Sequence, residues 1–95
     1  MTKAQALLDL RRKEKAAQDA LNAELRAGVA RDAAKCAFDR DATEHNAAVY
    51  AAAIQTFATA FAMTTALATD HQKAKAAFRQ WIDDDVRKRL QCEMF

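Results

Sequence analysis

The feature that most restricts the fold of this chain is a run of 24 residues without a charged side chain. Residues 46–69 read NAAVYAAAIQTFATAFAMTTALAT. At about 1.5 Å per residue, a helix of this length crosses the hydrocarbon core of a membrane. Three interpretations therefore fit: a membrane span, the core helix of a soluble bundle, and a surface kept for a partner.

The composition of residues 46–69 argues against a membrane span. Most of the apolar residues are alanine, which gains little from leaving water, and Gln55 and several threonines add polar groups that disfavour insertion. Tyr50 is the only Trp or Tyr near either end, where such residues would mark a membrane interface. The start of the chain also lacks the apolar segment of a secretory signal. We therefore expect no membrane association and a cytoplasmic location.

Few residues in the chain are able to end a helix. There is no proline, the only glycine is Gly28, and alanine, the best helix former, fills about a quarter of the positions. The sequence therefore predicts a single all-α domain over residues 1–95. Helical spacing of apolar residues predicts a first helix over 2–27, a central helix capped by Asp41 or Thr43, and a last helix.

Two positions decide how many helices form. Gly28 either ends the first helix or lies within one long helix kinked there, and Thr69 with Gln72 forms a second capping pattern at which a helix restarts or continues. We expect a bundle of three to four helices around the long apolar central helix. Residues 11–15, RRKEK, place charge on every side of the first helix. We therefore expect residues 1–12 to form a loosely held N-terminal arm.

The flanking helices are too charged to surround the central helix. One side of residues 46–69 carries bulky residues and predicts a core, while the other sides are small and uncharged. We therefore expect a homodimer that completes a larger bundle by two-fold symmetry. The residues expected at the self-association surface are Ala51, Phe57, Ala58, Phe61 and Ala62.

The residues that catalysis or metal binding would require are missing or badly placed. The chain has no serine, and a single glycine excludes a glycine-rich phosphate loop. Asp83, Asp84 and Asp85 diverge by about 100° each on a helix, so they do not converge as catalytic carboxylates. Cys36 and Cys92 are isolated and lack zinc-ligand spacing. We expect no enzymatic activity, no cofactor and no metal.

These exclusions favour a small protein that acts by protein–protein binding, such as an inhibitor or assembly factor of the kind that phages and mobile elements encode. The residues expected to contact the partner are Leu7, Leu8, Arg11, Arg12, Trp81, Asp83, Asp84 and Asp85. The alternative is a nucleic-acid-associated dimer that uses the basic segment Arg11–Lys15 for phosphate contacts. A net charge of only +2, with acidic residues among the basic ones, ranks this alternative second.

Overall fold

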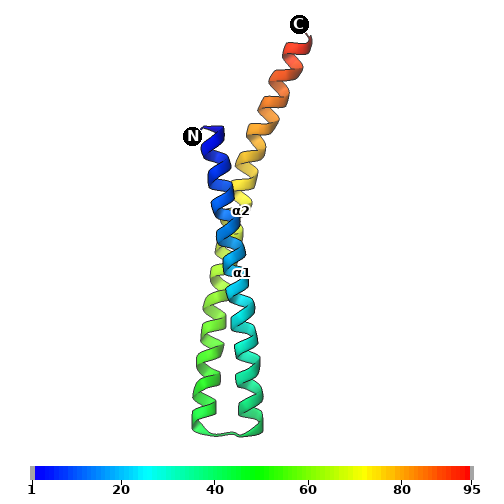
Figure 1. The fold of residues 1–95 in the computed structure, drawn as a ribbon. Coiled ribbons are helices and arrows are strands. Elements are labelled where there is room, and N and C mark those ends of the chain that lie inside the picture. Colours follow the sequence, from blue (N-terminus) through cyan, green and yellow to red (C-terminus); the bar gives the residue numbers. More distant parts are fainter. Residues whose placement is uncertain (1, 95) are drawn as a thin grey trace.

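The chain folds into a single antiparallel pair of long helices (Figure 1). The computed structural model describes the backbone of residues 2–94 and the side chains of residues 2–92. Helix α1 spans Lys3–Arg40, helix α2 spans Glu44–Met94, and residues 41–43 connect them. The hairpin measures 78 × 20 × 13 Å. The predicted all-α class is confirmed. The predicted bundle of three to four helices is wrong, because both expected break points lie inside a helix.

Gly28 lies within α1, which continues for twelve residues beyond it. Its φ angle is not positive, so its backbone does not use the freedom that only glycine has. A Cβ atom at this position would lie 3.4 Å from Cε2 of Phe57 on α2. Gly28 therefore packs beside Phe57 in the interior of α1 and does not end a helix.

Thr69 likewise does not start a new helix, because α2 runs unbroken for 51 residues. The Thr69 hydroxyl donates to the carbonyl of Thr65 at 3.0 Å, one turn earlier. Four other threonine hydroxyls in α2 bond back by four residues in the same way. A threonine bonded backward satisfies its hydroxyl inside the helix instead of capping a new one.

The connection between the helices is closed by two polar side chains. The Thr43 hydroxyl accepts from the backbone N–H of Asn46 at 3.1 Å, so Thr43 is the cap of α2. The Asn46 side-chain amide donates to the carbonyl of Asp41 at 2.8 Å and to that of Ala37 at 3.5 Å. The same two carbonyls also accept backbone N–H groups of the connection, from Thr43 and Asp41 respectively, so the side chain of Asn46 reinforces the turn.

The described part of the predicted N-terminal arm forms the first turns of α1. Met1 lies outside the described residues. Thr2 caps the helix, since its hydroxyl accepts from the N–H of Gln5 at 3.2 Å while the Gln5 side chain accepts from the N–H of Thr2 at 2.8 Å. Ala6 is buried, so the contact with α2 extends into this segment.

The two helices meet along a seam with a seven-residue repeat. On α1 the buried residues are separated by multiples of seven: Ala6, Ala20, Ala27 and Ala34. On α2 the buried and half-buried residues recur at alternating steps of three and four: Tyr50, Ala53, Phe57, Ala60, Thr64, Leu67, His71, Ala74 and Phe78. This spacing is typical of a coiled coil. Small residues on α1 therefore receive the larger side chains of α2.

Contacts between the helices fix their register. In order from the loop to the open end, the contacting pairs are Phe38 with Tyr50, Arg31 with Phe57, Ala20 with Thr64, and Lys3 with Asp85. Since Lys3 is the first residue of α1, residues 86–94 of α2 extend beyond it. We call residues 86–94 the overhang. It curves away from α1 and projects past the N-terminal end (Figure 1).

Candidate interaction surface

The hairpin exposes far more surface than a compact protein of its size. Its accessible area is 7368 Å², whereas a folded monomer of 10.5 kDa exposes about 5,400 Å². Its radius of gyration is 21.8 Å, against about 12 Å for a compact domain of 95 residues. Among the described residues, the buried apolar side chains are all alanines. Two helices alone therefore leave every large apolar side chain at least partly exposed among the described residues.

Four of these large side chains lie on one side of the hairpin. Phe61 is 55% exposed, and Leu21, Leu25 and Ile54 are exposed as well. Leu21, Ile54 and Phe61 each follow a seam residue by one position, so each is rotated by about 100° from the seam, whereas Leu25 lies farther round α1, two positions before Ala27. In antiparallel helices this rotation brings residues of both helices to the same side. We call Leu21, Leu25, Ile54 and Phe61 the Phe61 face.

A shallow groove with small side chains adjoins the Phe61 face. It is lined by Glu24, Phe61, Thr64, Thr65, Ala68, Thr69 and Gln72. The Thr64 hydroxyl lies within hydrogen-bond distance of the carbonyls of Ala60 and Ala20, at 2.9 and 3.1 Å. Its donor is therefore satisfied by the hairpin itself. The groove is thus suited to an apolar side chain from another molecule.

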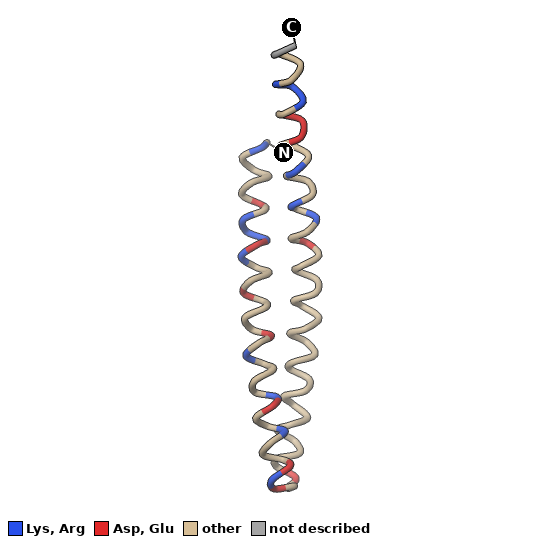
Figure 2. The backbone as a smooth tube through the Cα atoms, turned by 90° about the vertical axis from the view of Figure 1, so that its right-hand side faces the viewer, with Lys and Arg blue, Asp and Glu red and all other residues tan. Residues whose placement is uncertain are grey.

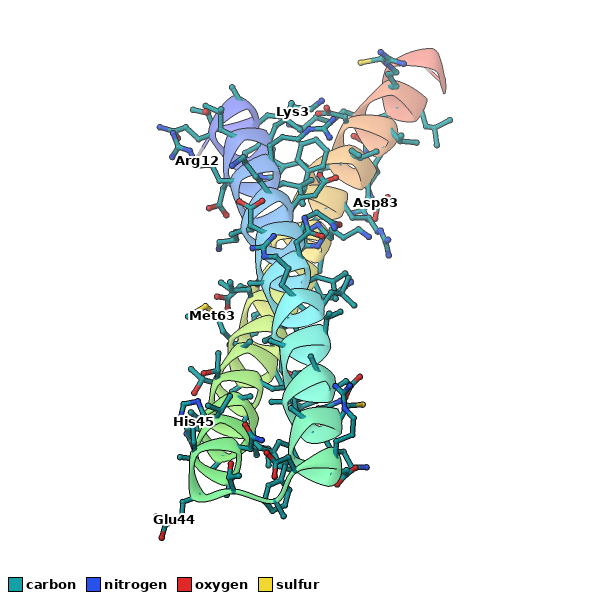
Figure 3. All side chains as sticks on the ribbon, turned by 60° about the horizontal axis from the view of Figure 1, so that its bottom comes forward. Lys3, Arg12, Glu44, His45, Met63 and Asp83 are labelled. Atoms are coloured by element: carbon teal, nitrogen blue, oxygen red, sulfur yellow. The ribbon has the colours of Figure 1, made fainter. Side chains whose placement is uncertain are left out.

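The opposite side of the hairpin carries a second groove. Its groove is lined by Ala20, Ala23, Gln55, Thr56, Thr59, Ala60 and Met63. Met63 extends outward from α2 on this side (Figure 3). Apart from Met63, the side chains that line this groove are small or polar.

Charge is confined to α1 and to the two ends of α2 (Figure 2). No charged residue lies between His45 and Asp70. The basic segment Arg11–Lys15 is largely neutralised within α1, where three of its residues form ion pairs at 3.2–3.4 Å: Arg11 with Glu14, Lys13 with Asp9, and Lys15 with Asp19. Arg12 extends away from the hairpin (Figure 3). The paired charges weaken the case for a phosphate-binding surface.

The residues predicted to contact a partner lie near the open end of the hairpin. Leu7 and Leu8 on α1 and Trp81 on α2 are exposed there. Asp83 and Asp84 line a shallow groove with Ala76, Arg79, Gln80 and Arg87. Asp85 is separate from them, because it forms an ion pair with Lys3 across the opening. The hydrogen bond from Lys3 lowers the pKa of Asp85 below its ordinary value of 3.8.

The residues predicted for self-association divide between the seam and the surface. Ala51, Ala58, Phe61 and Ala62 are exposed. Phe57 is half-buried in the seam, where its ring lies 4.2 Å below the guanidinium carbon of Arg31.

Sequence reasoning missed Leu21, Leu25 and Ile54 as members of one surface. The signal that would have found them is the seven-residue repeat of Ala20, Ala27 and Ala34. This repeat locates the seam on α1 and thereby the residues that flank it.

Two further properties bear on the surface. By length and composition alone, the part of α2 from Glu44 to Cys92 is apolar enough to cross a membrane. None of the residues in the most apolar stretch of α2 is buried against α1. Within residues 2–92, no group of three His, Cys, Asp or Glu side chains is placed to hold a metal ion. Comparison with known protein families, curated proteins and solved structures finds no match for this chain.

Proposed function

We propose that this chain is a non-enzymatic cytoplasmic protein that acts by protein–protein binding, as an assembly factor whose hairpin packs against other helices. The observation that carries the proposal is the accessible area of 7368 Å², about 1,900 Å² above that of a compact monomer. Large apolar patches on soluble proteins mark interaction sites. The Phe61 face supplies such a patch together with an adjoining groove.

Charged residues on α1 support a protein partner over a membrane. The part of α1 that packs along the uncharged stretch of α2 carries Glu24, Arg26, Arg31, Asp32 and Lys35. If α2 crossed a bilayer as part of the hairpin, these charges would enter it as well. Charged side chains at the centre of a bilayer are strongly unfavourable. In a protein complex the exposed charges of Arg26, Asp32 and Lys35 remain in water.

A photo-cross-linking experiment tests this proposal. Benzoylphenylalanine replaces either Phe61 on the apolar face or Val29 on the outside of α1, in cells that express the chain. Val29 is 72% exposed and lies two positions beyond the buried Ala27, which places it about 160° around α1 from the seam. We expect protein adducts from position 61 and few from position 29. Lipid adducts alone at position 61, or equal protein yields at both positions, would contradict the proposal.

A further inference from the structure

We infer that the molecule covering the Phe61 face is a second copy of this chain, packed antiparallel to the first, so that the overhang of each copy covers the uncharged half of the other copy's α2. This inference rests on the proposed function and names the partner.

The uncovered area is large enough for a stable dimer interface. The excess of about 1,900 Å² per chain gives about 3,800 Å² for two chains. Interfaces of obligate homodimers bury roughly 2,000–5,000 Å² in total. Two hairpins also supply four helices, which is enough to enclose a core that two helices leave open.

The groove beside the Phe61 face is the part of the surface that a two-fold interface would bring against itself. In such an interface the same patch occurs on both partners, so it must complement itself. Ile54 and Leu25 protrude from the face, while Thr65 and Ala68 line the groove beside it. When the two α2 helices overlap over their full length, Thr65 and Ala68 of both copies lie close to the two-fold axis, and Ile54 lies opposite residue 84 of the other copy.

The distribution of charge favours the antiparallel orientation. A parallel dimer would place residues 83–85 of one copy, all aspartate, beside the same residues of the other, and like charges repel. An antiparallel dimer places them beside the uncharged half of α2 instead. It also covers Val86 and Leu90 of the overhang, which are exposed in the single hairpin.

The lengths of the helices then place the two-fold axis. If both α2 helices overlap from Glu44 to Met94, the axis passes close to Thr69, midway between these residues. Thr65, Ala68 and Thr69 line the groove at this level. Small side chains at a helix crossing allow the two backbones to approach closely.

The two cysteines are free and exposed, so labels attached to them report the distance between the same residue in the two copies. The register places Cys36 level with residue 52 of α2, and Cys92 lies in the overhang. At about 1.5 Å per residue from an axis at Thr69, the two Cys36 residues of an antiparallel dimer lie roughly 50 Å apart and the two Cys92 residues roughly 70 Å apart. In a parallel dimer, each pair lies within the width of the bundle, about 25 Å.

Pulsed dipolar spectroscopy on spin-labelled full-length chain tests the inference. Cys92→Ala carries the label at Cys36, Cys36→Ala carries it at Cys92, and light scattering gives the mass of each sample. We expect the mass of two copies and the two long distances. Short distances for both labels would overturn the antiparallel arrangement.

Two other results would overturn the second copy as the partner. One is a helical monomer in solution that shows no distance between labels. The other is a labelled chain that sediments with vesicles of phosphatidylglycerol and phosphatidylcholine as a monomer. A helical monomer that still gives photo-cross-links to another protein from position 61 would refute the dimer and leave the proposed function standing. Lipid adducts alone would refute both.

Discussion

Replacing Phe61 by alanine should separate the dimer into hairpins without unfolding them. A phenylalanine side chain offers roughly 200 Å² for burial, so the 55% that is exposed in one hairpin leaves about 110 Å² for a partner to cover. At about 25 cal/mol per Å², each copy loses about 2.5 kcal/mol of association free energy. A two-fold dimer contains two such residues and loses about 5 kcal/mol, which raises its dissociation constant by more than ~10³-fold.

The helix itself should tolerate this substitution. Alanine favours a helix by a few tenths of a kcal/mol over phenylalanine, which roughly offsets the lost contact with Phe57, whose ring centroid lies 6.4 Å away. Sedimentation velocity over a dilution series measures the dissociation constant, and circular dichroism measures the helix content. Val29→Ala on the outer side of α1 is the matched control and should associate as the unmodified chain does. An unchanged dissociation constant for Phe61→Ala would refute the reasoning.

Three further predictions concern the seam, the open end and the basic segment. Gly28→Ala should stabilise the chain by about 0.5–1 kcal/mol, because alanine favours a helix over glycine and the added methyl group meets Phe57 at an ordinary contact distance. Thermal unfolding at fixed concentration measures this change in stability. A lower melting temperature than that of the unmodified chain would contradict it. The Lys3–Asp85 ion pair should be intact at neutral pH and be lost as the pH falls through the lowered pKa of Asp85. Amide chemical shifts at the start of α1 should therefore titrate below pH 3.8, and they should not do so in Asp85→Asn. Because Arg11–Lys15 is largely ion-paired within α1, gel shifts at low salt should show no complex with DNA or RNA; a complex that weakens steeply with salt would revive the nucleic-acid alternative.

The helical class could be predicted from the sequence, whereas the number of helices could not. The absence of proline and the abundance of alanine favour long helices whatever their arrangement. Glycine and threonine end or cap helices in many proteins. The residues around Gly28 and Thr69 do not show whether these two positions end a helix or lie inside one. Contact with Phe57 decides the role of Gly28, and a backward hydrogen bond to Thr65 decides that of Thr69.

The candidate surface was only partly predictable for a similar reason. Phe61 and Phe57 lie on one side of an ideal helix, so spacing alone assigns both to one surface. The position of α1 separates them, because Gly28 and Arg31 cover Phe57 while Phe61 stays exposed. The contribution of Leu21 and Leu25 to the Phe61 face also depends on the register of α1 against α2. The spacing of residues within one helix does not reveal this register.

The central claim is that one hairpin does not complete its own core and that a second copy does. Sedimentation equilibrium of the full chain, from about 1 to about 100 µM in buffer without detergent, tests it most directly. The account predicts a species of twice the chain mass of 10.5 kDa, which separates into folded hairpins only on dilution. A species of 10.5 kDa that keeps its full helix content at every concentration would contradict it.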